Sequence, residues 1–370
     1  MRKNFLIKVA FFIVSMTMMG PSAYAQTILV DEASGDPLVK ASIFDRYGRF
    51  IGVSSENGEV PSDIDASAYP IIVRYVGYVP VEISAPNSGK IGLTESEYNL
   101  PEVVVDDQSR NMLYLTGYVR TYGSGTTSND TVTSYKEEIV DFMIPRTKKA
   151  KFKGWKKARV LASHTYENIK KKERDTLIYK EGEKNDFGGS FNITEVHKIP
   201  EPVRNGEKEW YVVDGKYYPK ETWKVIGDNY ILEEDDLADY KDHKYAPSIL
   251  KIFGASASMN QAEYKYKFDK TDREEIIPED FLEMTEIWNL DLTGRLFKKG
   301  FNSDDPINLN YYTEIYVTDR QYLTQDEAKE LKNNKPVVID SKIEAPKGIP
   351  APLPQMEDLK KRVIESRKEK

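Results

Sequence analysis

Apolar and polar residues alternate along most of the chain after residue 112. Alternation is found over much of the runs LYLTGYVRTY (113–122), TVTSYKEEIVDFMI (131–144), EYKYKFD (263–269), WNLDLTGRLF (288–297) and NYYTEIYVTD (310–319). A period of two is typical of a β-strand that buries one face. The segment EWYVVDGKYYPKETWKVI (209–226) adds a hairpin with Asp214-Gly215 at its turn. We therefore predict a β-rich domain over 112–335, a large, mainly antiparallel, curved or sandwich-like sheet with one face solvated by Lys and Glu.

One strand of this sheet carries a histidine among apolar residues. In ARVLASHTYENI (158–169), strict alternation places Val160, Ala162, His164 and Tyr166 on the same face.

The region 27–105 has shorter apolar runs with turn residues about every ten positions. Ser34-Gly35-Asp36-Pro37 and Glu56-Asn57-Gly58 are turn sequences. In IIVRYVGYVPVEI (71–83), Gly77 allows a bend between two strands that its flanking tyrosines would not adopt cheaply. This pattern predicts a small β-sandwich, joined to the larger domain by a polar linker at 106–111.

Few helices are expected, and they are short. Thr324 and Glu327 fit a capping box that opens a helix ending near Asn333. The segment 346–354, PKGIPAPLP, predicts a proline-rich tether. A terminal helix follows at 355–370, with Met356, Leu359 and Val363 on one side, which either docks or frays.

The first 25 residues have the features of a signal peptide. A basic start is followed by the apolar run VAFFIVSMTMMG (9–20) and a small-x-small site that ends at Ala25. The run is too short to span a bilayer as a helix. We predict an exported protein, periplasmic or associated with an outer membrane; an uncleaved N-terminal anchor is the alternative.

Four motifs in the first domain resemble those of carboxypeptidase-like regulatory domains. They are DEASGDPLVKASI (31–43), SENGEV (55–60), YVGY (75–78) and LPEVVV (100–105), in the order and spacing of that family. Arg74 stands where the family has Ser, and Val60 where an aromatic residue is usual. The resemblance implies a transthyretin-like sandwich of about seven strands, found in exported proteins of the Gram-negative cell envelope. It implies no peptidase activity, because the domain is an accessory in the enzymes that gave it its name.

Composition narrows the class further. The chain has a net charge of −7, 24 tyrosines and no cysteine. Disulfides and thiol catalysis are thereby excluded, and stability depends on core packing. The abundant aromatic residues favour β structure.

The stretch 146–174 is an exception to the acidic balance, with twelve Lys or Arg against two Glu. Basic side chains around a tryptophan can contact anionic lipid headgroups; a solvated loop and strand face is the alternative. The residues proposed for such a contact are Lys148, Lys149, Lys151, Lys153, Trp155, Lys156 and Lys157. Export argues against a nucleic-acid partner.

No motif in the sequence identifies catalytic, cofactor-binding or metal-binding residues. The histidines at 164, 197 and 243 are not spaced as metal ligands, and the acidic run at 232–244 has no glycine for a calcium loop. Nucleophile-elbow and nucleotide-binding motifs are absent from the sequence. We therefore expect a non-catalytic exported envelope protein, an adaptor or binding module without a cofactor, whose partner is another envelope protein, a glycan or a lipid. A curved sheet with an apolar concave face would suit a lipid, and an envelope hydrolase is the alternative.

Overall fold

The computed structural model describes residues 26–46, 48–96, 109–147, 150–171, 176–181, 197–294, 306–334 and 343–368. The chain forms two compact units: the first extends to residue 95 without 76–79, and the second contains 76–79 and the chain from 96 onward. The predicted signal peptide (1–25), the motif at 100–105 and residues 106–108 of the predicted linker lie outside the described residues.

Short strands build the first unit. They are β1 (Thr27–Asp31), β2 (Ser42–Phe44), β3 (Phe50–Val53), β4 (Ile71–Arg74), β5 (Val81–Ile83) and β6 (Gly89–Leu93), with one 3₁₀ turn, η1 (Ala66–Ala68). β1 and β6 pair in parallel, and the other four form an antiparallel sheet in the order β3-β2-β4-β5. Leu29, Ile43 and Leu93 are completely buried in this unit.

Two glycines in turns are required by geometry. Gly58 has φ +74°, and a Cβ there would lie 2.3 Å from the carbonyl oxygen of Leu29. Gly77 has φ +81° and lies between the end of β4 and the start of β5, which confirms the predicted break. Only glycine adopts this left-handed region without strain.

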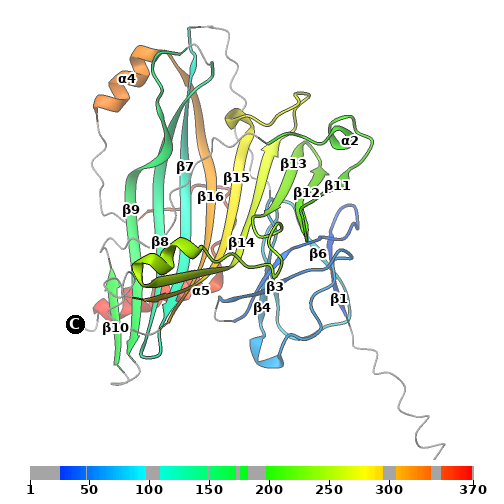
Figure 1. The fold of residues 1–370 in the computed structure, drawn as a ribbon, viewed down its shortest axis with the longest axis vertical. Helices are drawn as coiled ribbons and strands as arrows, with labels where there is room; N and C mark the ends of the chain where they lie inside the picture. Colours follow the sequence, from blue (N-terminus) through cyan, green and yellow to red (C-terminus); the bar gives the residue numbers. More distant parts are fainter. Residues whose placement is uncertain are drawn as a thin grey trace, which may run out of the picture. The chain divides into compact units, whose positions relative to one another are not determined.

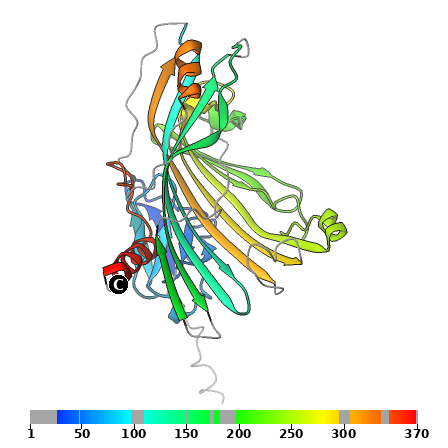
Figure 2. The same ribbon diagram turned by 90° about the vertical axis from the view of Figure 1, so that its left-hand side faces the viewer.

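The second unit contains a ten-stranded antiparallel sheet (Figure 1). Its strands are β7 (Met112–Thr126), β8 (Asp130–Pro145), β9 (Trp155–Lys171), β10 (Thr176–Glu181), β11 (Trp210–Asp214), β12 (Pro219–Ile226), β13 (Asn229–Asp235), β14 (Ala255–Asp269), β15 (Phe281–Gly294) and β16 (Ile307–Leu323). Their order is β10-β9-β8-β7-β16-β15-β14-β13-β12-β11. The sheet is curved, as Figure 2 shows, and the prediction of a mainly β protein with a large antiparallel curved sheet is confirmed.

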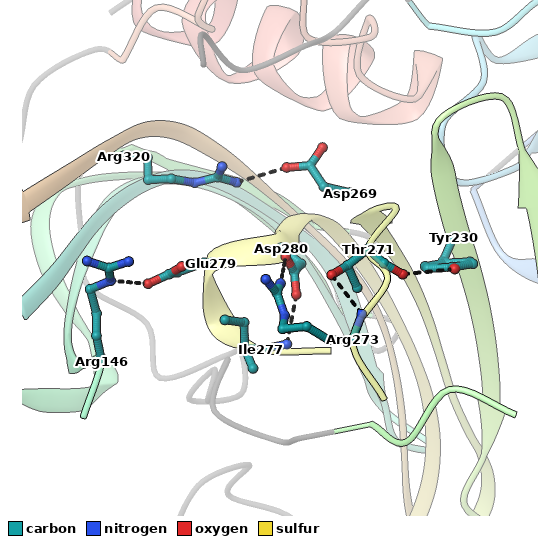
Figure 3. Close-up of polar contacts among 9 residues, drawn as sticks. All are labelled: Arg146, Tyr230, Asp269, Thr271, Arg273, Ile277, Glu279, Asp280 and Arg320. Atoms are coloured by element: carbon teal, nitrogen blue, oxygen red, sulfur yellow. Dashed lines mark hydrogen bonds and ion pairs between the residues drawn. The ribbon is translucent and has the colours of Figure 1, made fainter. Parts of the chain in front are cut away.

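The two faces of this sheet are covered differently. On the concave face, a core that includes Leu115, Phe142 and Trp223 packs against Ile199 and Ile276 from two loop segments. On the opposite, convex face, Glu137 of β8 forms an ion pair with Lys360 of the C-terminal helix. Figure 3 shows the strands arching over the loop that contains residues 271–280.

Two sequence expectations for this sheet are wrong. A β-bulge in β9 pairs Val140 with Val160 and Ile139 with Ala162, so Val160 faces the concave core while Ala162, His164 and Tyr166 face the convex side. Strict alternation cannot anticipate this, because one extra residue reverses the facing of all that follow.

The face expected to be solvated also carries charged residues that are buried. Glu233, Lys265 and Glu283 lie on the convex face and are nevertheless buried. The register places Glu233 opposite Lys265, so opposite charges adjoin across neighbouring strands. Charged residues at alternate positions therefore do not by themselves indicate exposure.

Short helices and turns complete the unit. They are α2 (Glu201–Arg204), η2 (Ser248–Phe253), η3 (Pro278–Asp280), α4 (Gln325–Asn333) and α5 (Pro354–Lys368). The predicted capping box of α4 is confirmed, since the Thr324 hydroxyl accepts from the amide N–H of Glu327 and the Glu327 carboxylate accepts from that of Thr324.

The C-terminal segment packs on the convex face. α5 lies against β8, β9 and β10, and Met356, Leu359 and Val363 are buried as one side of the helix. The preceding segment differs from the expected tether: Leu353 is completely buried, and the Pro350 carbonyl accepts from Arg120 at 2.9 Å. The prolines restrict the backbone of this segment, and its apolar residue Leu353 is buried in the unit instead of being exposed in a free tether.

Candidate functional site

Four adjacent cross-strand rows on the concave face carry mostly apolar and aromatic residues. The register of β14, β15 and β16 aligns Tyr264 with Glu286, Ala262 with Trp288 and Tyr311, Met259 with Leu290 and Leu309, and Ala257 with Leu292 and Ile307. Residues directly opposite each other in an antiparallel pair point to the same face. We call the following residues the aromatic shelf: Met259, Tyr264, Glu286, Trp288, Leu290, Leu309 and Tyr311.

The alternating sequence of β15 builds the shelf. Trp288 and Leu290 point to the concave side, while Asn289 and Asp291 point to the convex side. Both polar side chains take part in a ladder of side-chain hydrogen bonds there, with Asn260 donating to each. This ladder fixes the strands from behind and leaves the concave side apolar.

Aromatic stacking gives the shelf a defined surface. The rings of Trp288 and Tyr311 stack with centroids 5.6 Å apart, and Tyr264 meets Trp288 edge-on at 6.4 Å. Tyr264 in turn stacks on Tyr266 at 6.2 Å, where the filled core begins. Trp288, Tyr311 and Tyr264 are only half-buried, so the shelf is the part of the concave face that the described core residues leave partly open.

Glu286 is the electrostatic anomaly of the shelf. Its side chain is buried, with 6% of the residue exposed, and its Oε2 atom has no hydrogen-bond partner among the described residues. Burial, and secondarily the charge of Asp236, raises the pKa of Glu286 to about 7. Burial, followed by the charge of Glu286, also raises the pKa of Tyr311.

The shelf has a second polar atom of this kind. The indole Nε1 of Trp288 is buried and makes no hydrogen bond within the described part of the chain. Buried polar atoms are normally paired, because an unmade hydrogen bond costs about 1–3 kcal/mol. A carboxyl group and an indole N–H on an apolar, aromatic surface are the elements of a site for a ligand with an apolar body and a polar group.

The other half of the concave face is closed by a pinned loop (Figure 3). Arg146 of the segment after β8 forms an ion pair with Glu279 of the loop, and Arg273 pairs with Asp280 within the loop. A third pair, Arg320 with Asp269 at 3.3 Å, joins β16 to the end of β14, where the loop begins. Tyr230 adds a hydrogen bond to the Thr271 carbonyl at 3.2 Å. Ile276 of the loop is 1% exposed and belongs to the core, so this end of the sheet is structural.

A buried polar cluster beneath α5 is also structural. Glu137 accepts from the hydroxyls of Tyr118 and Tyr135 at 2.7 and 3.0 Å and from Lys360 at 2.8 Å. Next to it, Arg120 and Glu314 form an ion pair at 2.6 Å in which both side chains are buried. These groups bond one another and α5, so they clamp the C-terminal helix to the sheet.

The basic segment predicted to meet an anionic surface is only partly described. Lys148 and Lys149 lie outside the described residues, and Lys151, Lys156 and Lys157 are exposed. Lys153 donates to the Ala150 carbonyl at 3.1 Å.

Trp155 of that segment is held by the sheet. Its indole N–H donates to Asp141 at 2.9 Å, and the Arg159 guanidinium lies 4.0 Å from its ring centroid. Contact of the exposed lysines with an anionic surface stays a prediction. Trp155 would support the strand from which Lys156 and Lys157 project and would not itself insert into lipid.

Each histidine has a different partner. His164 lies 3.1 Å from Glu181, His243 lies 2.6 Å from Asp235, and His197 packs on the Tyr266 ring, where burial lowers its pKa to about 4. Within the described ranges, no group of three His, Cys, Asp or Glu is placed to hold a metal ion. No helix in that part of the chain is long and apolar enough to cross a membrane.

Comparisons with known proteins add little. No family model matches the sequence, and no curated protein matches it. The solved structures that resemble this chain include a lipovitellin described for its lipid–protein interactions (TM-score 0.28, 9% identity, 58% of this chain and 26% of that one) and a putative AttH of Nitrosomonas europaea (TM-score 0.17, 8% identity, 57% and 53%). They also include a DUF1329 family protein from Desulfovibrio piger (TM-score 0.10, 9% identity, 56% and 85%). The chain thus spans about a quarter and about half of the first two, and none of these likenesses supports an argument about function.

Sequence reasoning missed Glu286 as a functional candidate. The alternating run WNLDLTGRLF begins at Trp288. Glu286 lies two residues before it, so the same alternation places Glu286 on the face of Trp288. A glutamate at an inward position of an apolar row was the available signal.

Proposed function

We propose that the protein is a non-catalytic, exported envelope protein whose second unit binds a ligand with a long apolar body on the aromatic shelf. The observation that carries the proposal is a half-buried aromatic surface beside two buried polar atoms, Glu286 Oε2 and Trp288 Nε1, which have no hydrogen-bond partner among the described residues. The apolar body would cover Trp288 and Leu290, and its polar group would reach Glu286. A lipid-like molecule has this chemistry.

Export and an adaptor role for the first unit belong to the same proposal. The N-terminal apolar run with its small-x-small site supports export, and the motifs of the first unit resemble those of envelope proteins. An exported lipid-binding module would meet its ligand at or between envelope membranes.

A hydrolase of the envelope is the second candidate. The observation in its favour is Glu286, whose pKa of about 7 suits a general acid or base. We favour binding because Glu286 is surrounded by Trp288, Tyr311 and Tyr264, which offer contact area to an apolar ligand.

Displacement of a fluorescent apolar probe tests the binding proposal. The protein is loaded with N-phenylnaphthylamine, and dodecanol is titrated in. Replacing Trp288 by Ser should weaken binding of both compounds about tenfold or more, because it removes the stacked centre of the shelf.

The matched control is Trp210→Ser, since Trp210 is 42% exposed on the edge strand β11, away from the shelf. It should bind as the parent does. Equal affinity of all three proteins, or no probe binding by the parent, would refute the proposed function.

A further inference from the structure

Exposed apolar side chains gather at one place in the second unit. Of the eight large hydrophobic residues that are exposed in the described part of the chain, six lie between residues 217 and 252. The most exposed are Ile252 at 79% and Ile249 at 62%. Both belong to η2, the short turn that directly precedes β14.

The geometry of η2 joins the two isoleucines into one ridge. In a 3₁₀ helix, residues three apart lie above one another. Ile249 and Ile252 have this spacing and therefore project together. Gly254, with φ +65°, ends the turn and directs the chain into β14.

The segment that carries the ridge is firmly held. Tyr245 and Met259 exchange backbone hydrogen bonds at 3.0 and 2.8 Å, and the rings of Tyr240 and Tyr245 lie 4.8 Å apart. His243 bonds Asp235 at the end of β13. The exposure of the ridge is thus a property of an ordered element, which Figure 2 shows as the lime-green coil beyond the ends of the long strands.

Within the segment 240–254, which follows the acidic run, the charges are mainly positive. Residues 240–254 contain three lysines and one aspartate, a net charge of +2 in a chain of net charge −7. Lys241, Lys244 and Lys251 are all exposed. An apolar ridge flanked by lysines and tyrosines has the composition of elements that lie in an anionic lipid interface.

The segment also borders the aromatic shelf. Met259, a shelf residue, pairs with Tyr245, and Ala257 continues the apolar row toward η2. We propose that residues 240–254 form a docking tip that inserts Ile249 and Ile252 into the headgroup region of an anionic lipid surface. The tip would set the end of the shelf at the membrane, from which an apolar ligand could pass to it.

Co-sedimentation with vesicles tests the docking tip independently of ligand binding. The full chain should bind vesicles of phosphatidylglycerol and phosphatidylcholine more tightly than vesicles of phosphatidylcholine alone. The I249S/I252S variant should lose about tenfold or more in partitioning, because two exposed isoleucines no longer enter the interface. The K241Q/K244Q/K251Q variant should lose the preference for the anionic vesicles.

Trp210→Ser is the control, because it removes an exposed aromatic residue outside the tip and should bind as the parent does. A variant with Lys151, Lys156 and Lys157 changed to Gln compares the basic segment with the tip. If only that variant lost vesicle binding, the contact would belong to the basic segment and not to the tip. Retained vesicle binding by I249S/I252S, or no binding by the parent, would overturn the proposal. Self-association of the parent that I249S/I252S abolishes, without vesicle binding, would identify a second copy as the occupant instead.

Discussion

At the scale of single residues, Glu286 differs most from what its neighbours would suggest. It is a carboxyl group on an apolar row, with one oxygen unpaired among the described residues. A buried carboxyl group destabilises the fold when it is charged, and groups with strongly shifted pKa values cluster at functional sites. The same residue gives the proposed site its polar end.

The raised pKa of Glu286 makes stability depend on pH. An acid whose pKa is higher in the folded than in the unfolded state stabilises the fold at low pH, and this contribution is lost as the pH rises. The window runs from the ordinary value of 4.5 to about 7. Glu286→Gln, which stays neutral, should therefore be more stable than the parent at pH 8 by up to about 3 kcal/mol, and much less so at pH 4.

Urea unfolding at the two pH values measures this difference. Glu263→Gln is the matched control, because Glu263 lies on the opposite face of the neighbouring strand β14 and is only half-buried. A Glu286→Gln effect that is the same at both pH values would show that the carboxyl is not held neutral.

At the scale of elements, the sequence predicts a structure well when residues close together in the chain determine it. It predicts poorly when the structure depends on pairing with another strand. Thr324 and Glu327 form their capping box within a few residues, so α4 was predictable. The bulge beside Val160 depends on the pairing of β8 with β9, and no pattern within β9 reveals it. The apolar side of α5 was visible in the sequence, but the surface that it covers was not.

α5 should contribute to stability through its apolar side as well as through its ion pair. Met356 is completely buried, so Met356→Ala should cost about 2–5 kcal/mol. Hydrogen exchange should then become faster in α5 and in the strands that it covers.

Lys361→Ala is the control for that experiment, because Lys361 is exposed on the same helix. It should leave the exchange of α5 nearly unchanged. If Met356→Ala and Lys361→Ala gave equal exchange rates, α5 would not be held by burial of its apolar side.

At the scale of the whole molecule, composition and the alternation of apolar and polar residues predicted the fold class. Locating the candidate site required the register in which the strands pair. A mainly β chain with a large antiparallel sheet follows from the alternating runs and the aromatic content. The shelf depends on which residues of β14, β15 and β16 stand opposite one another, and that information is not present in any one strand. The location of a site on a sheet face is therefore a property of the assembled strands.

Fluorine NMR of the protein labelled with 5-fluorotryptophan tests the central claim most directly. The chain has four tryptophans, and only Trp288 belongs to the shelf, while Trp223 is completely buried in the filled core. On titration with dodecanol, the Trp288 resonance should shift with saturation, and those of Trp155, Trp210 and Trp223 should stay in place. A Trp288 resonance that does not respond, while dodecanol binds and another tryptophan shifts, would contradict the account.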